Sequence, residues 1–176
     1  MYIYGLDLSM VNTGIAVFDT DIQNFVHISS INTSNLTKKK YNNTHDGMRL
    51  KKIYEGLVEI LDKYPPEVVA IERGFTSQNT STQILYRVHG VANLVFAEYE
   101  QIYYPPKSVK ATVYHGTADK DELATLIEKR LGTEFMNYDE SDACAVALTY
   151  LIKNDMIYWS DVKQLTKKQK EKISKK

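Results

Sequence analysis

Cysteine is almost absent from this chain, because Cys144 is the single one among 176 residues. An internal disulfide is therefore excluded, and with it the class of small secreted scaffolds that disulfides hold together. The sequence also lacks any run of about 18–20 consecutive apolar residues, the length that a membrane-spanning helix needs. Its first residues carry no basic segment of the kind that opens a signal peptide. We expect no membrane segment and a cytoplasmic location, in a bacterial cell or a phage-infected bacterial host.

The chain also has no excess of charge of either sign: 22 lysines and arginines balance 22 aspartates and glutamates, so its formal net charge is zero. The bulk charge of such a chain does not attract nucleic acid, so an argument for DNA binding depends on where the charges lie. Hydrophobic residues make up 43% of the chain, which is enough for the core of one globular domain. The basic residues gather at 38–40, at 49–52, at Lys107 with Lys110, and within 163–176.

The end of the chain differs in composition from the rest. Residues 162–176 contain seven lysines, one glutamate and three aliphatic residues. A segment with few apolar side chains and many like charges cannot bury enough surface to fold. We therefore predict one folded domain over residues 1–160 and a flexible basic tail over residues 161–176.

Strand and helix patterns follow one another along the folded part. Three β-rich runs come first, and helices of 3.6-residue periodicity then alternate with short apolar runs. Pro65 and Pro66 end the first helix, and Gly132 ends the third. This order predicts an α/β domain of three layers, with a mixed five-stranded sheet and helices on both faces, in a ribonuclease-H-like layout. The expected strands are 2–8, 13–18, 24–30, 67–71 and 101–104, and the expected helices are 44–64, 81–97, 121–131 and 140–153.

Acidic residues stand at the ends of two of these apolar strands. Asp7 ends the first strand and Glu72 ends the fourth, and an unpaired buried carboxylate there would cost several kcal/mol. Asp139 and Asp142, three residues apart at the start of the last helix, can point toward the same place. Ligand sites of such sheets lie beyond the carboxyl ends of the strands, so we expect the four carboxylates to converge.

The chemistry of such a site follows from its ligands. Carboxylate oxygens suit Mg²⁺, for which Mn²⁺ can substitute, and two ions about 4 Å apart can hydrolyse a phosphodiester. Each residue also has a plainer interpretation. Asp139 could cap the last helix, and Glu72 could pair with Arg73 or Lys107 at a strand end. Asp7 has no adjacent basic partner, which makes it the hardest to explain without a ligand.

Five groups of short motifs follow one another along residues 1–152. They are Gly5-Leu6-Asp7 with Thr13-Gly14, Arg49-Leu50-Lys51 with Ile53-Tyr54, Ala70-Ile71-Glu72 with Phe75, His89-Gly90-Val91-Ala92, and Asp139-Glu140-Ser141-Asp142-Ala143. In order and spacing they resemble the RuvC family of Holliday-junction resolvases, within the ribonuclease-H-like nucleases. The tyrosine-rich composition and short length suggest a divergent member, from a phage or its low-GC Gram-positive host.

The resemblance implies a metal-dependent endonuclease that resolves four-way or other branched DNA by paired cuts. Asp7, Glu72, Asp139 and Asp142 take the place of the catalytic tetrad with two metal ions, and the protein is expected to act as a homodimer. Phe75 stands at the family's base-stacking position. Stacking of a base on an aromatic ring contributes about 1–3 kcal/mol to binding. The predicted DNA-binding set comprises Phe75, Arg73 in the same loop, Lys107, Lys110 and Lys120.

The first motif departs from the family at one point. Leu8 and Ser9 replace the usual proline and glycine after Asp7, while the aspartate itself is kept. The segment around Gly74 and Thr76 also differs, so the preferred cut sequence stays open, as does a branch-migration motor as a partner. Two other functions are retained as alternatives: an RNA-processing nuclease of the YqgF type, and an actin-like nucleotide-binding protein, because Asp7-Leu8-Ser9 also resembles a phosphate-binding hairpin.

Three further residues are weaker candidates for a functional role. His115 lies in a loop where it could approach DNA or shuttle a proton, although most loop histidines are plain surface. His89 is expected to pack at a close helix contact or a dimer interface. Cys144 stands on an alanine-rich helix and is expected to be a small buried hydrophobe.

Overall fold

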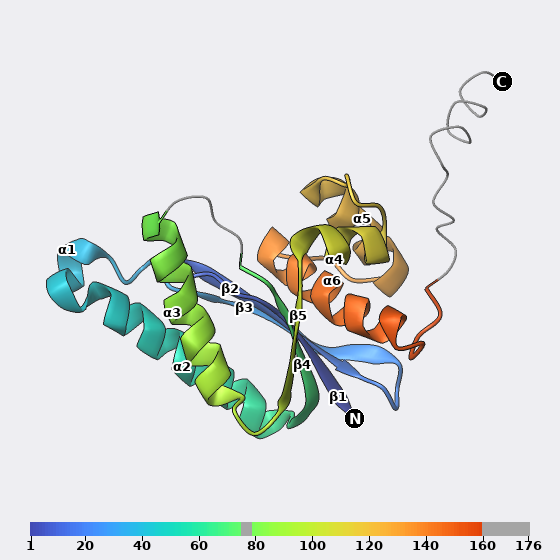
Figure 1. The fold of residues 1–176 in the computed structure, drawn as a ribbon, viewed down its shortest axis with the longest axis horizontal. Helices are drawn as coiled ribbons and strands as arrows, with labels where there is room; N and C mark the ends of the chain where they lie inside the picture. The colour runs from blue at the N-terminus through green and yellow to red at the C-terminus, as the bar shows by residue number, and fades with distance from the viewer. Residues whose placement is uncertain (75–78, 160–176) are drawn as a thin grey trace, which may run out of the picture.

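A five-stranded mixed sheet organises the chain (Figure 1). The computed structural model describes residues 1–74 and 79–159. The strand order is β3-β2-β1-β4-β5, with β1 antiparallel to β2 and β2 to β3, and with β1, β4 and β5 parallel. This topology confirms the predicted fold class. The strands are β1 (Tyr2–Asp7), β2 (Asn12–Asp19), β3 (Asn24–Asn32), β4 (Pro66–Glu72) and β5 (Glu100–Tyr104).

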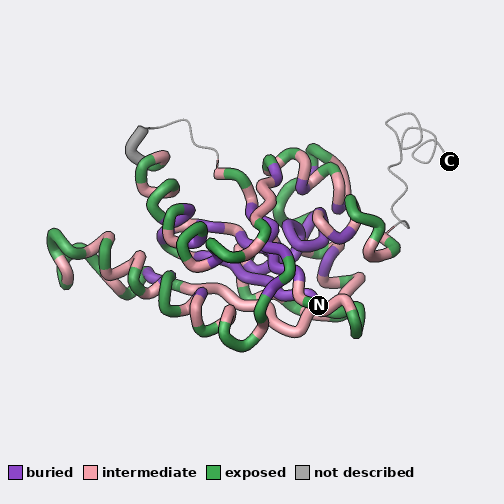
Figure 2. Tube along the Cα trace, turned by 60° about the horizontal axis from the view of Figure 1, so that its bottom comes forward, coloured by how far each residue is buried: buried purple, intermediate pink, exposed green. Residues whose placement is uncertain are grey.

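Helices cover both faces of the sheet (Figure 1). One face of β1 and β4, with Leu6 and Ile71, packs on α2 and α3. The opposite face, with Ile3 and Ala70, packs on α6, and α4 and α5 pack against α6 in the same core. Successive strand residues point to opposite faces, so these central strands are apolar on both sides. Figure 2 shows the buried residues gathered between the helical layers. The helices are α1 (Lys38–Tyr41), a 3-10 turn η1 (Asn42–Thr44), α2 (His45–Lys63), α3 (Asn79–Val95), α4 (Pro106–Val113), α5 (Lys120–Leu131) and α6 (Tyr138–Lys153).

The α6 helix lies directly on β1 and β2 because two glycines leave room for it. A Cβ atom on Gly5 would stand 2.1 Å from the backbone oxygen of Ala143, and one on Gly14 would stand 1.9 Å from the backbone oxygen of Asp139. Real Cβ atoms do not approach so closely, so only glycine fits at these positions. This contact brings the first turn of α6 to the end of β1 that carries Asp7.

The observed elements differ from the predicted ones at a few boundaries. The last helix begins at Tyr138, two residues before the predicted start, and the second long helix runs over 79–95 instead of 81–97. Two helices were not predicted: α1, which buries no residue, and α4, which begins at Pro106. Proline favours the first turn of a helix, where no backbone N–H donor is needed.

Two further predictions concern the end of the chain and the absence of a membrane segment. The basic tail predicted for 161–176 lies outside the described residues. None of the helices in 1–74 and 79–159 combines the length and apolar composition that crossing a bilayer requires.

Candidate active site

Asp7 and Glu72 end two adjacent parallel strands at the same edge of the sheet. The pairing of Leu6 with Ile71 brings the following residues, Asp7 and Glu72, side by side. Burial, followed by the charges of Glu72, Asp142 and Asp139, raises the pKa of Asp7 to about 8 against the effect of Lys120. Burial, together with Asp142, raises the pKa of Glu72 to about 7. Two carboxyls that resist ionisation in this way mark a site that lacks compensating positive charge.

Asp139 and Asp142 extend from the first turns of α6 toward this pair. The N-cap of α6 is Asn137, whose side-chain oxygen accepts a hydrogen bond from the backbone N–H of Glu140 at 3.1 Å. The interpretation of Asp139 as the helix cap is therefore wrong. Its Oδ2 atom instead accepts a hydrogen bond from Nδ2 of Asn12 at 2.6 Å. Asp139 thus has a partner in the hairpin after β1.

Lys120 places a cation beside the acidic group. Its Nζ atom lies 2.6 Å from Oδ2 of Asp142. Burial opposes the charge of this lysine, but the hydrogen bond to Asp142 and the charges of Asp142, Asp7 and Asp139 outweigh it and raise its pKa. A capping box between Asp119 and Glu122 fixes the start of α5, where Lys120 is the first residue. The helix end therefore presents the ammonium group to the carboxylates.

Asp7 thus interacts electrostatically with the other three predicted carboxylates, and Glu72 also interacts with Asp142. In the described part of the chain, however, no three Asp, Glu, His or Cys side chains are gathered closely enough to hold one ion. Asp142 is held by Lys120, and Asp139 is held by Asn12.

The other predicted DNA-binding residues are placed around the same edge. Lys110 donates from Nζ to the backbone oxygen of Ala118 at 2.7 Å, and its charge lowers the pKa of Glu72 against the effect of burial. Lys107 and Arg73 are exposed, and among the described residues neither forms an ion pair with Glu72. The strand-end salt bridge considered for Glu72 is therefore wrong for these partners. Phe75 lies outside the described residues.

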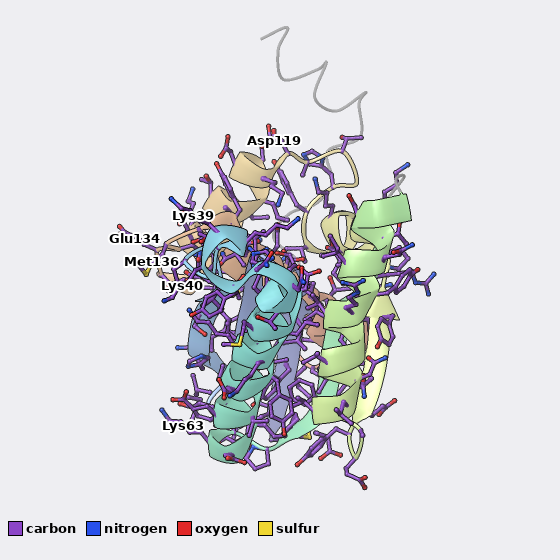
Figure 3. All side chains as sticks on the ribbon, turned by 90° about the vertical axis from the view of Figure 1, so that its left-hand side faces the viewer. Lys39, Lys40, Lys63, Asp119, Glu134 and Met136 are labelled. Atoms are coloured by element: carbon purple, nitrogen blue, oxygen red, sulfur yellow. The ribbon has the colours of Figure 1, made fainter. Side chains whose placement is uncertain are left out.

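A further group of lysines was noted in the sequence without a role. Lys38, Lys39 and Lys40 form α1 and are all exposed. Figure 3 shows Lys39 and Lys40 at one end of the α1–α2 pair and Lys63 at the opposite end. Because β3 runs parallel to β1, α1 follows the edge of the sheet at which Asp7 lies.

The remaining candidates have structural surroundings. Cys144 is fully buried, and burial raises the pKa of its thiol well above the ordinary value, which confirms a packing role. His89 is buried, as expected for a close helix contact, and burial lowers its pKa. His115 contacts Thr117 in its own loop and lies 3.8 Å from Glu122. The residue that the sequence did not reveal is Asn12, because its partner lies 127 positions away.

Comparison with known proteins connects this geometry to a family. The family model described as "Crossover junction endodeoxyribonuclease RuvC" matches residues 3–150. The chain belongs to the RuvC family. The predicted endonuclease family is thereby confirmed over the YqgF-type and actin-like alternatives.

The RuvC relatives align along most of their length. The RuvC of Brachyspira hyodysenteriae is 29% identical over 172 residues, which cover 93% of this chain and all of that protein. The RuvC of Alkaliphilus metalliredigens is 33% identical over 158 residues, with 85% and 92% coverage. Among solved structures, Thermus thermophilus RuvC matches with a TM-score of 0.72 at 25% identity, over 89% of this chain and 96% of that one. The yeast mitochondrial Holliday junction resolvase shares the fold, with a TM-score of 0.57 at 15% identity, over 96% of this chain and 85% of that one.

Proposed function

We propose that this RuvC-family chain resolves four-way DNA junctions, and other branched DNA, by metal-dependent hydrolysis of two phosphodiester bonds. The observation that carries the proposal is the meeting of Asp7 and Glu72 with the first turn of α6, where Asp7 has a pKa of about 8 and Glu72 of about 7. Lys120 on α5 and Lys110 on α4 act electrostatically on Glu72 at this sheet edge, so the site combines oxygen ligands with cations that can face a phosphate.

We assign Asp7, Glu72, Asp139 and Asp142 to two Mg²⁺ ions, which Mn²⁺ could replace. The donor set fits because all four groups are carboxylates. An added cation would offset both the mutual repulsion and the cost of burying charge that raise the pKa values of Asp7 and Glu72. When bound, the ions supply an activated water and stabilise the leaving oxygen.

The chain's own residues position the DNA in this proposal. Lys120 and Lys110 neutralise the phosphate at the cut, with Lys107 and Arg73 contacting the backbone nearby. Phe75 stacks on a base at the junction. Because the described residues form one such site, paired cuts require two copies, and we propose a two-fold homodimer. Residues 1–160 form the nuclease domain, residues 161–176 add a basic tail, and the protein acts in the cytoplasm.

The decisive experiment compares substrates and metals with the full chain. Labelled four-way junction, fork, duplex and structured RNA are each incubated with Mg²⁺ and with EDTA. We expect paired, Mg²⁺-dependent cuts in the junction, loss of cleavage in Asp7→Asn and Glu72→Gln, and retained junction binding in both variants. Cleavage by either variant, or cleavage of RNA in preference to the junction, would overturn the proposal.

A further inference from the structure

The hairpin between β1 and β2 contributes a side chain to the active site. Asn12 donates from Nδ2 to Oδ2 of Asp139 at 2.6 Å, which is short for an N–H to oxygen bond and typical of a charged acceptor. The bond uses one lone pair of Oδ2 and fixes the direction in which the carboxylate points. Asn12 thereby restricts the rotation of a carboxylate assigned to the metal site.

The orientation of the Asn12 amide is set by this contact. Its other end, Oδ1, is buried and, within the described residues, has no hydrogen-bond partner. Turning the amide over would place Oδ1 against the carboxylate oxygen of Asp139, where two acceptors repel each other. The buried oxygen without a partner is therefore tolerated because the donor is needed at Asp139.

The backbone of Asn12 is held as firmly as its side chain. The hydroxyl of Ser9 accepts a hydrogen bond from the backbone N–H of Asn12 at 3.0 Å and donates to the backbone oxygen of Asn12 at 2.9 Å. The hydroxyl of Thr13 donates to the backbone oxygen of Ser9 at 2.7 Å. Glycine at position 9 would have no side chain to make these bonds.

We propose that Asn12 is a positioning residue for Asp139, and that Ser9 acts through Asn12 by fixing the turn. This inference rests on the proposed metal-dependent function, because it assigns Asp139 to the metal site. Hydrogen-bonding partners of metal ligands typically contribute about 10–100-fold to metal affinity or activity. Asn12 thus prepares one ligand of the site before the metal and the DNA arrive.

The test uses Asn12→Leu, which keeps the size and removes the donor, with Asn12→Ala and Ser9→Ala as further variants. The matched control is Asn154→Ala, since Asn154 also donates from Nδ2 to a helix oxygen, that of Tyr150 at 2.8 Å, but at the far end of α6. Mn²⁺ binding to the DNA-free protein is measured by calorimetry, and the Mg²⁺ concentration for half-maximal junction cleavage is measured separately. Circular dichroism melting checks that each variant is folded.

In Asn12→Leu and Asn12→Ala, we expect about tenfold weaker Mn²⁺ binding and a matching rise in the Mg²⁺ requirement, with a smaller change in the rate at saturating Mg²⁺. Ser9→Ala should move the same quantities less far. Wild-type Mn²⁺ affinity in both Asn12 variants, an equal loss in Asn154→Ala, or no Mn²⁺ binding by the wild type would overturn the inference. A wild-type protein that binds Mn²⁺ but cuts no junction would overturn the proposed function alone, because the affinity comparison still judges Asn12.

Discussion

The Nζ atom of Lys120 lies 2.6 Å from Oδ2 of Asp142, so a lysine occupies a carboxylate that we assign to a metal ion. The ammonium group of Lys120 and a metal ion would compete for the same carboxylate oxygen. The lysine side chain is about half exposed, with 56% of its surface accessible, and can swing away on its flexible stem. If a metal ion binds Asp142, we therefore expect Lys120 to release this carboxylate and to become available to the phosphate.

Replacing Lys120 by methionine should therefore have two opposite effects. Mn²⁺ should bind more tightly to Lys120→Met, because Asp142 loses its competing cation. Junction cleavage at saturating metal should fall about tenfold or more, since a hydrogen bond to a charged group contributes about 1.5–3 kcal/mol. Calorimetry and single-turnover cleavage measure the two quantities. Lys129→Met, which replaces an exposed lysine on the same helix, is the control. If Lys120→Met lost both Mn²⁺ affinity and cleavage rate, Lys120 would not compete with the metal ion for Asp142.

Asp7 should oppose folding in the metal-free protein while being essential for cleavage. Its pKa is raised from the ordinary 3.8 to about 8, so the folded state holds the proton more tightly than the unfolded state. Stability of the metal-free protein is therefore lost as pH rises between these values. At pH 8, Asp7→Asn should raise the melting temperature by about 2–4 °C, the shift that roughly 1 kcal/mol gives at this size, and abolish cleavage. An unchanged or lower melting temperature in EDTA would contradict this.

Stabilisation by Mg²⁺ should depend on pH in the opposite sense. Metal binding requires ionised carboxylates, and Asp7 and Glu72 release their protons only near pH 8 and pH 7. The rise in melting temperature on adding Mg²⁺ should therefore be larger at pH 8 than at pH 6. The double variant Asp7→Asn with Glu72→Gln serves as the control and should lose this pH dependence. An equal Mg²⁺ effect at both pH values would show that other groups bind the ion.

The sheet could be predicted from the sequence because its pattern is local. Apolar runs that end in Asp7 and Glu72 identify two strands and their active-site edge without knowledge of any distant contact. The four-residue α1 helix could not be predicted in this way, since it buries no side chain and has no periodicity to detect. The α4 helix was missed because Pro105 and Pro106 indicate a break as readily as a helix start.

The candidate site was predictable in its acidic residues and unpredictable in their partners. Spacing placed Asp139 and Asp142 on one helix but could not decide between a cap and a ligand, because Asn137 competes for the cap only two positions earlier. The contacts of Asn12 with Asp139 and of Lys120 with Asp142 join separate elements of the fold. Such contacts depend on how α6 packs on the sheet and α5 on α6, which no local pattern encodes.

The close approach of α6 to β2 makes Gly14 a test of how the fold positions the carboxylates. A Cβ atom there would stand 1.9 Å from the backbone oxygen of Asp139 and 2.5 Å from its carbonyl carbon. Backbone atoms cannot move aside as a flexible side chain can, so the start of α6 must shift away from the sheet. Asp139 and Asp142 would then move relative to Asp7 and Glu72.

We expect Gly14→Ala to cost about 1–3 kcal/mol of folding free energy, as overpacking usually does, and to reduce cleavage at saturating Mg²⁺. The control is Gly47→Ala on α2, where an added Cβ meets no atom within 4 Å. Because alanine favours helix over glycine, Gly47→Ala should gain about 0.5–1 kcal/mol and keep full activity. Denaturant unfolding and single-turnover cleavage measure both variants. Full activity in Gly14→Ala would show that the carboxylates tolerate a displaced α6, and that the contact serves packing alone.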